Sequence, residues 1–304
     1  MKFKIKKKSF FYENFFYLNK IMKNFLLLIF IIFVSCKNEV KNYSFLSKIP
    51  YDLENPSKKI KLNHNLREIS GLSFYKKNLL LAVQDEKGEI FVIDFKKGKI
   101  INNIKFGKNG DFEAIEKVGD FIYVLRSDGK IFEVKNFDNE NIEFTKYHTI
   151  LNKKNNLEGM TYDKKSNSLL IACKDQPNLE DSKILKNCRS VYSFSIDKKQ
   201  IIKDNFFIIS IDELKNILDI KRNFSFKISG IAQNPITKNY YVIGTVGKLM
   251  VILNENYEII ELIKLNPHIF KKPEGICFSK KGKLFIANEG KKGKGNVLVF
   301  DKQN

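Results

Sequence analysis

The sequence predicts an all-β fold, a five-bladed β-propeller with about four strands per blade, and three observations support this prediction. Residues 68–106 form four short β-rich runs joined by polar turns, most of which contain glycine, as in an antiparallel meander. The opening motif of this meander recurs four more times along the chain. Most recurrences are about 45 residues apart, which is typical of propeller blades.

The recurring openings read EISGL, FEAI, LEGM, ISGI and PEGI, and each is expected to begin the innermost strand of one blade. They align on Ser70, Glu113, Glu158, Ser229 and Glu274. The third interval is longer because of two insertions, residues 176–188 between the second and third strands and residues 211–223, which we expect to form a short surface helix. No sixth opening lies in this interval, so five blades are favoured over a six-bladed alternative.

The fifth unit provides only three strands before the printed sequence stops. Residues 58–63 read KKIKLN and immediately precede the first unit, and we expect them to supply the missing strand. Such closure removes the exposed sheet edges that an open stack of blades would leave.

The first 36 residues are expected to direct the chain to a membrane surface. Residues 25–34 are ten consecutive apolar residues preceded by Lys20 and Lys23, as in a short secretory signal, and ten residues are too few to span a bilayer. Residues 33–36 read FVSC and resemble a bacterial lipobox. Cys36 would then carry acyl chains such as palmitate, which hold a protein on a membrane when two are present. The alternative is an ordinary buried cysteine.

These features give a domain organisation. We expect an extended leader over residues 1–21, with Met22 as the true start, a lipoprotein signal peptide over 22–36, a tether over 37–57 and the propeller over 58–304. The protein would be lipid-anchored in the cell envelope. No Asp follows Cys36, which favours the outer membrane by analogy with lipoprotein sorting.

The basic composition does not by itself indicate a nucleic-acid binder. The chain has 54 Lys and Arg against 34 Asp and Glu, a formal net charge of +20. The lysines are scattered over turns such as YKKN, FKKGK, DKKSN and SKKGK. Lysines in turns are usually a solvated surface, so attraction to anionic lipid or polysaccharide is favoured over nucleic acid.

The remaining cysteines give no metal motif. Cys173 and Cys277 lie in apolar runs and are expected in the core, and the chain has no C-x-x-C pair or His/Cys cluster that would indicate zinc. A disulfide between Cys173 and Cys188 is open, because spacing alone does not decide it.

The five openings, with LAVQDEKGEIFVID after the first, resemble the SdiA-regulated (YjiK-like) proteins, which are exported or membrane-attached bacterial β-propellers. The resemblance covers roughly residues 58–304, and the order of serine and glutamate at the openings is its most specific feature. It implies a propeller fold and a location in the envelope. It implies no defined activity.

The opening residues are the first candidate site, because the innermost strands of a propeller line its channel. Glu113, Glu158 and Glu274 would repel one another around a narrow axis unless a positive group lies among them or their pKa values rise. Oxygen ligands of this kind suit Ca²⁺, so we expect an axial calcium ion or a cationic ligand there. The alternative is structural: the Glu and Ser side chains would accept hydrogen bonds from backbone N–H groups of the neighbouring blade, and the glycines that follow would allow close packing.

The loops between second and third strands are the second candidate site, because they lie at the same mouth of the channel. The candidate rim residues are Gln84, Asp85, Glu86, Arg126, Ser127, Asp128, Lys174, Asp175, Thr245, Asn288 and Glu289. This mixture of charges suits a small polar or sugar-like ligand or a loop of a partner protein, although charged turns are also common without a role.

Two functions follow as alternatives. The first is a binding module that recognises an envelope protein or a glycan at the channel mouth. The second is a calcium-assisted hydrolase of phosphoesters or lactones, which needs a base or nucleophile beside the metal. His64, His148 and His268 are expected in linking segments, so only carboxylates converge, and binding is favoured.

Overall fold

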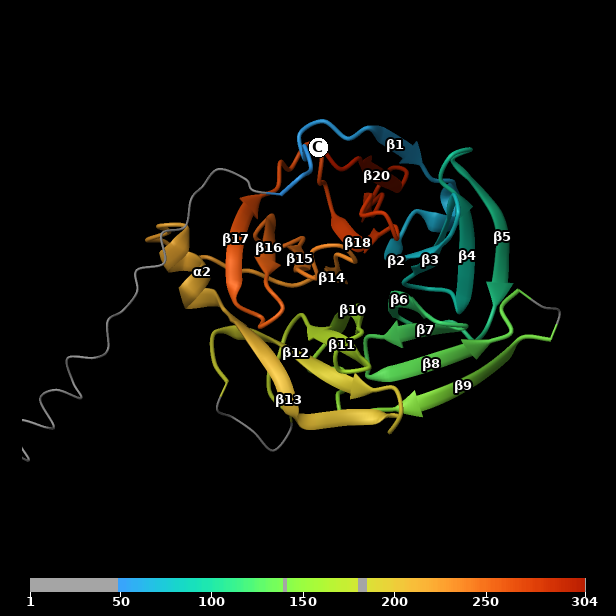
Figure 1. The fold of residues 1–304 in the computed structure, drawn as a ribbon, viewed down its shortest axis with the longest axis horizontal. Coiled ribbons are helices and arrows are strands. Elements are labelled where there is room, and N and C mark those ends of the chain that lie inside the picture. Colours follow the sequence, from blue (N-terminus) through green and yellow to red (C-terminus); the bar gives the residue numbers. More distant parts are fainter. Residues whose placement is uncertain (1–48, 139–140, 180–184, 304) are drawn as a thin grey trace, which may run out of the picture. The chain divides into compact units, whose positions relative to one another are not determined.

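A computed structural model describes residues 49–138, 141–179 and 185–303 (Figure 1). In this part of the chain the strands form five antiparallel sheets of four strands, which are the blades of the propeller. Blade 1 contains β2 (Ile69–Lys76), β3 (Leu79–Gln84), β4 (Glu89–Asp94) and β5 (Lys99–Lys105). Blade 2 contains β6 (Phe112–Val118), β7 (Phe121–Arg126), β8 (Lys130–Lys135) and β9 (Glu143–His148). Blade 3 contains β10 (Leu157–Asp163), β11 (Ser168–Cys173), β12 (Cys188–Ser195) and β13 (Gln200–Ser210). Blade 4 contains β14 (Gly230–Gln233), β15 (Tyr240–Gly244), β16 (Leu249–Leu253) and β17 (Ile259–Lys264). Blade 5 contains β18 (Pro273–Phe278), β19 (Leu284–Asn288), β20 (Asn296–Phe300) and β1 (Lys58–Lys61).

The five blades close into a ring around the innermost strands. Each of β2, β6, β10, β14 and β18 contacts the next, and β18 contacts β2 (Figure 1). The N-terminal strand β1 pairs antiparallel with β20, with Ile60 opposite Val297. The five-bladed prediction and the closing strand are therefore confirmed, and the six-bladed alternative is wrong.

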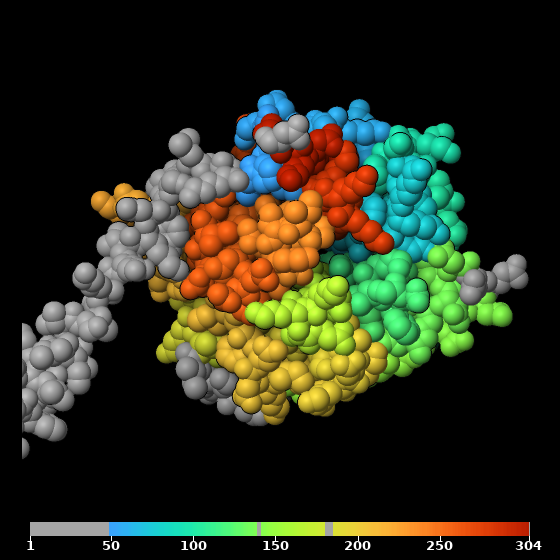
Figure 2. Space-filling view, viewed as in Figure 1, coloured from blue at the N-terminus to red at the C-terminus, as the bar shows by residue number. Residues whose placement is uncertain are grey.

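The core consists of apolar layers between neighbouring blades. Several middle strands are almost entirely apolar, as in β3 and β16, because both faces of each sheet are covered by another blade. One layer joins Leu80 and Phe91 of blade 1 to Phe285 and Val299 of blade 5, and similar layers join the other neighbours. Side chains fill the spaces that the ribbon leaves open (Figure 2). The outermost strands are more exposed, as in β5.

The two insertions of blade 3 lie where the sequence predicts them. Residues 176–188 join β11 to β12, and their part 180–184 lies outside the described residues. The second insertion contains the short helix α2 (Ile211–Ile217), whose N-cap Ser210 accepts a hydrogen bond from Glu213 N at 3.2 Å. Cys173 and Cys188 are buried and unpaired, as is Cys277, so no bridge joins the first two.

The segment before β1 packs on the propeller. Tyr51 and Leu53 are buried against blades 4 and 5. The Tyr51 hydroxyl donates to Gly282 O at 2.6 Å, and Asn234 Nδ2 donates to the Tyr51 hydroxyl at 3.1 Å. The expected tether over 37–57 is therefore corrected in its last part, because these aromatic and amide contacts fix residues 51–53 in place.

The N-terminal predictions concern a different part of the chain. The leader, the signal peptide and Cys36 lie outside the described residues. Within the described ranges no helix is long and apolar enough to cross a membrane.

Candidate functional site

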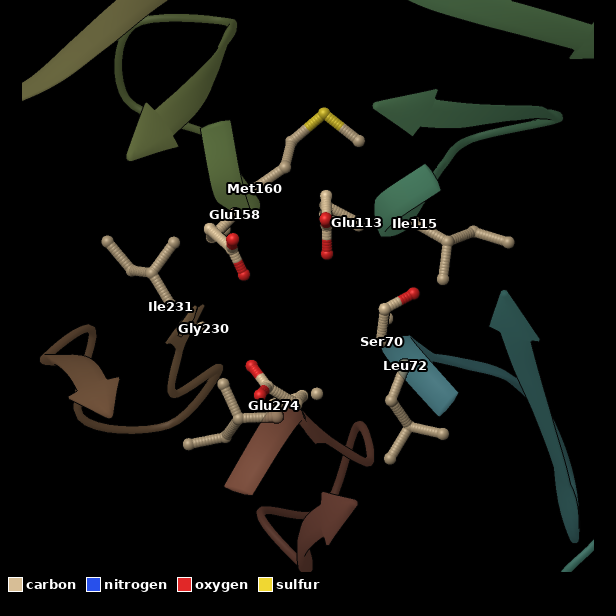
Figure 3. Close-up of a pocket in the computed structure, with 14 residues that line it drawn as sticks. Ser70, Leu72, Glu113, Ile115, Glu158, Met160, Gly230, Ile231 and Glu274 are labelled. Atoms are coloured by element: carbon tan, nitrogen blue, oxygen red, sulfur yellow. The ribbon is translucent and has the colours of Figure 1, made fainter. Parts of the chain in front are cut away.

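The upper mouth of the channel, as we call it, is formed by the opening residues Ser70, Glu113, Glu158, Ser229 and Glu274 and by the turns between second and third strands. Figure 3 shows the carboxylates of the three glutamates pointing toward the axis from β6, β10 and β18. The cavity between them has a volume of about 10 Å³, close to the minimum that one water molecule needs. A sugar or a peptide therefore does not fit at this level of the channel.

Local bulges direct these side chains into the channel. The pairing of β2 with β3 shifts register between Ile69 and Gly71, which places Ser70 at the irregularity. The inner strands of blades 2, 3 and 5 shift register at Glu113, at Glu158 and across Glu274. A bulge re-aims a side chain that regular pairing would place on a sheet face.

The glycines that follow the openings allow the inner strands to approach closely. A Cβ on Gly230 would lie 2.4 Å from Glu274 O, and one on Gly71 would lie 2.8 Å from the Cα of Ala114. Both contacts are too short for real atoms and involve the backbone of the next blade. These positions therefore require glycine for packing near the axis.

Two lysines supply positive charge among the glutamates. Lys174 Nζ donates to Glu158 Oε1 at 2.5 Å, and Lys272 Nζ lies 3.6 Å from Glu274 Oε1. Burial raises the pKa of Glu158 to about 7, while the Lys174 ammonium opposes this change. Burial, followed by the charge of Glu158, raises the pKa of Glu274 to about 8. The repulsion is thus relieved both by ammonium groups and by protons.

Glu113 is held by a neighbouring carboxylate. Burial is the main cause that raises its pKa well above 4.5, and the charges of Glu158 and Asp111 and a hydrogen bond with Asp111 add to it. The Ser127 hydroxyl also donates to Asp111, at 2.5 Å from Oδ2. Asp111 therefore accepts bonds from a serine and from a protonated Glu113.

Sequence reasoning missed Asp111 and Lys272. Each lies two residues before an opening glutamate, Asp111 before Glu113 and Lys272 before Glu274. This shared offset was the available signal. A charged residue two positions before an opening glutamate could have been predicted to lie beside that glutamate at the channel mouth.

The two serines brace neighbouring blades, but by donating rather than accepting. Ser70 Oγ donates to Phe112 O at 2.6 Å, and Ser229 Oγ donates to Pro273 O at 2.6 Å. The expected acceptance of backbone N–H groups occurs at other residues. Lys117 N donates to Ser73 Oγ and Gln233 N donates to Thr161 Oγ1, each at 3.1 Å. The expectation was therefore wrong about which residues accept, because the bulge turns Ser70 toward a carbonyl.

Two predicted rim groups form ion pairs, one within a turn of blade 2 and one between the turn after β11 and the segment before β14. Arg126 binds Asp128 with two hydrogen bonds, one from Nε to Oδ1 at 2.9 Å, and Lys130 binds the same carboxylate. The Arg126 side chain therefore lowers the pKa of Asp128. Lys227 Nζ and Asn156 Nδ2 bind Asp175, at 2.6 Å and 2.8 Å. These pairs hold their turns.

Other rim residues also hold turns. Gln84 accepts from Glu86 N at 2.6 Å. The fully buried Asn288 donates to Ile269 O at 3.2 Å, and Glu289 pairs with Lys272.

Thr245 donates its hydroxyl to Pro273 O. The predicted rim residues thus do not form one patch, and Lys174, Glu289, Thr245 and, through Asp111, Ser127 join the network of the channel glutamates.

Asp85 and Asn288 differ from the other rim residues, because each has a buried Oδ1 atom without a hydrogen-bond partner among the described residues, and of the two only Asp85 is ionisable. Burial, then the charges of Glu68 and Glu289, raises its pKa to about 6. Its Oδ1 atom is buried and has no hydrogen-bond partner among the described residues. An acceptor in this state costs free energy unless a donor reaches it.

A polar cavity opens beside Asp111. It has a volume of about 470 Å³, within the range of small-ligand sites, and lies between the turns of blades 1, 2 and 3. Its lining residues are Asn109, Gly110, Asp111, Arg126, Ser127, Asp128, Lys153 and Asn156. The cavity therefore offers carboxylates, amides and cations together.

The acidic side chains of the described residues are not arranged as a metal site. Among the described residues no group of three or more His, Cys, Asp or Glu side chains is placed to hold a metal ion. The axial calcium ion stays a prediction. The three histidines are exposed, outside the channel.

Comparison with known proteins agrees with this architecture. The sequence matches the SdiA-regulated family over residues 48–292. The chain belongs to the SdiA-regulated family. This match confirms the resemblance. The matched region also includes the packed residues before β1. A search of curated proteins finds no match to this SdiA-regulated chain.

Several solved structures are similar to this SdiA-regulated protein. Glutaminyl cyclase of Myxococcus xanthus has a TM-score of 0.55 and 10% identity, over 81% of this chain and 95% of that chain. A streptogramin B lyase has a TM-score of 0.46 and 11% identity, over 80% and 97%. Virginiamycin B lyase from Staphylococcus aureus has a TM-score of 0.42 and 12% identity, over 79% and 73%. At 10% identity the likeness to the glutaminyl cyclase shows the fold alone.

Proposed function

We propose that this propeller is a lipid-anchored binding module of the cell envelope that recognises a cationic group of a partner protein at its upper mouth. The observation that carries the proposal is the unpaired Oδ1 atom of Asp85, in a mouth where Glu68, Glu289, Glu86 and Asp111 all raise the pKa of that carboxyl.

The charges around Asp85 favour an ammonium or guanidinium group. A cation with N–H donors would satisfy the buried acceptor and lower the repulsion among the carboxylates in one step. Lys174 and Lys272 show how an ammonium fits among such carboxylates. A lysine or arginine side chain or an amino terminus of a partner has the same chemistry.

The neighbouring cavity suits the rest of such a ligand. It shares Asp111 with the mouth and presents the amides of Asn109 and Asn156. A polar cavity of this size can hold a short extended segment beside the cationic group. The narrow channel itself cannot, so recognition would take place at the surface of the upper mouth.

Trilysine is a suitable probe, and trilysine with acetylated side chains is its uncharged counterpart. We expect calorimetry with the full chain to detect trilysine binding and no binding of the acetylated peptide. The variant Asp85→Asn/Asp111→Asn should weaken binding at least about tenfold, a change of about 1.4 kcal/mol.

The control is Asp120→Asn/Asp204→Asn, which makes the same change in charge at exposed residues outside the upper mouth. Equal loss in both variants, or equal binding of the acetylated peptide, would contradict the proposal. A neutral oligosaccharide that binds both variants equally would point to a glycan ligand instead.

The calcium-assisted hydrolase is not proposed. It needs a general base beside a metal ion, and no observation on the described residues favours that arrangement over the ion pairs of Lys174 and Lys272.

A further inference from the structure

We propose that the opposite, lower mouth of the channel is a second binding site, for a small molecule or lipid headgroup that carries two or more phosphate or carboxylate groups. The lower mouth is formed by the far halves of the inner strands and by the turns between first and second strands. The proposal is independent of the function assigned to the upper mouth.

All five blades line a cavity of about 360 Å³ at this mouth, which is within the usual range of small-ligand sites. Its lining residues are Ser73, Phe74, Tyr75, Glu116, Lys117, Gly119, Thr161, Tyr162, Lys164, Ala232, Gln233, Pro235, Lys238, Cys277, Phe278 and Lys280. The cavity is thus wide where the channel between the glutamates is closed.

Four lysines surround this cavity, one from each of blades 2 to 5. They are Lys117, Lys164, Lys238 and Lys280. Within the described residues none of the four forms an ion pair with a carboxylate. Lys238 Nζ instead donates to Pro235 O at 2.6 Å, and Lys117 Nζ to Gly119 O. Four ammonium groups around one opening repel one another, and an anion with several charges would relieve this repulsion.

The cations of the two cavities differ in whether they form ion pairs with carboxylates. At the upper mouth Lys174, Lys272, Arg126 and Lys227 are each paired with a carboxylate. The four lysines that line the lower cavity have no carboxylate partner among the described residues, although Lys76, at the end of β2 and outside the cavity lining, pairs with Asp138.

The only acidic residue of the cavity lining does not oppose an anion at neutral pH. Burial raises the pKa of Glu116 to about 8, so its carboxyl is mostly protonated at pH 7. The hydroxyl of Ser73 donates to Glu116 Oε2 at 3.5 Å, and the proton of the neutral carboxyl is a further donor. The floor of the cavity therefore presents neutral donors and acceptors beneath a ring of positive charge.

This combination defines the ligand class. Separate lysines, each a compact point charge, suit phosphate or carboxylate groups spread over a body several ångströms wide. Tyr75 and Tyr162 add aromatic surface beside the lysines. A phosphorylated sugar and the headgroup of an anionic lipid share this chemistry, and binding experiments with two probes distinguish them.

The test uses the full chain and two probes at constant salt, because binding to lysines depends on ionic strength. Pyrophosphate represents a free polyanion, and phosphatidylcholine vesicles with and without phosphatidylglycerol represent a headgroup. The variant is Lys164→Gln/Lys238→Gln/Lys280→Gln. The matched control is Lys96→Gln/Lys97→Gln/Lys198→Gln, which removes equal charge from exposed turns away from the cavity.

We expect at least one probe to bind, with affinity reduced at least about tenfold in the variant and unchanged in the control. Binding of pyrophosphate alone assigns a free ligand, and binding of phosphatidylglycerol vesicles alone assigns a headgroup. Equal loss in variant and control would show a diffuse electrostatic surface and overturn the proposal. Absence of binding by both probes would overturn it as well.

Discussion

Lys174 Nζ lies 2.5 Å from Glu158 Oε1 at the upper mouth, joining the turn after β11 to the inner strand β10 of the same blade. The side chain of Glu158 is only 5% exposed, whereas that of Lys174 is 30% exposed. The partly exposed ammonium of Lys174 therefore binds the buried carboxylate of Glu158 from the solvent side. Removing one member of such a pair leaves an uncompensated group, which costs more than the pair contributes.

Stability should fall as pH rises through the range set by the channel glutamates. The pKa of Glu158 is about 7 and that of Glu274 about 8 in the folded protein, against an ordinary value of 4.5. Between these values the folded state binds protons that the unfolded state has lost, so a rising pH favours unfolding. We expect urea unfolding to show a loss of several kcal/mol, at most about 7 kcal/mol, between about pH 5 and about pH 9.

The variant Glu158→Gln/Glu274→Gln should reduce this pH dependence, because glutamine does not titrate, while Glu113, Glu116 and Asp85, whose pKa values are also raised, keep the remainder. Glu255→Gln, in an exposed turn between β16 and β17, serves as the control and should retain the wild-type slope. A double variant with the wild-type slope would show that other groups cause the pH dependence.

The close approach of blades 4 and 5 predicts a large cost for Gly230→Ala. The added Cβ would lie 2.4 Å from Glu274 O, a backbone atom that cannot move without shifting the inner strand β18. We expect a loss of about 2–4 kcal/mol in the free energy of unfolding. The control is Gly293→Ala, whose Cβ would lie 3.5 Å from its nearest neighbour and should change stability little. Equal effects of the two substitutions would contradict the packing argument.

The blade architecture was predictable because each blade repeats the same local requirement. The sequence shows glycine after the opening residue of four inner strands, at Gly71, Gly159, Gly230 and Gly275, and it shows a candidate closing strand directly before the first unit. The packing of residues 51–53 was not predicted, because the partners of Tyr51, Gly282 and Asn234, are distant in the sequence and come close to it only in the closed ring.

The site was less predictable than the fold. The three glutamates were expected at the axis, but the charges that neutralise them come from Lys174 and Lys272, and Lys272 was missed. Its position depends on how the loop before β18 returns to the channel, which strand periodicity does not encode. The same holds for Ser73 and Thr161, whose bracing bonds follow from the bulges near the openings.

Lipid attachment at Cys36 stays a prediction, since this residue lies outside the described part of the chain. In a bacterial host, we expect labelled palmitate to be incorporated into the wild-type chain and the protein to sediment with membranes. Cys36→Ser should abolish both, while Cys277→Ser, at a buried residue of β18, should leave the label in place. A labelled Cys36→Ser variant would exclude this cysteine as the site.

Calcium should compete with the lysines of the upper mouth for the same carboxylates. The ammonium groups of Lys174 and Lys272 already lie beside Glu158 and Glu274, so an axial ion must displace them. We expect Ca²⁺ to raise the Tm of Lys174→Gln/Lys272→Gln more than that of the wild type, because ligand binding to the folded state stabilises it by mass action. Chelator should reverse the change. The variant Glu113→Gln/Glu158→Gln/Glu274→Gln should not respond at all, and a response equal to that of the lysine variant would place any bound calcium outside the channel.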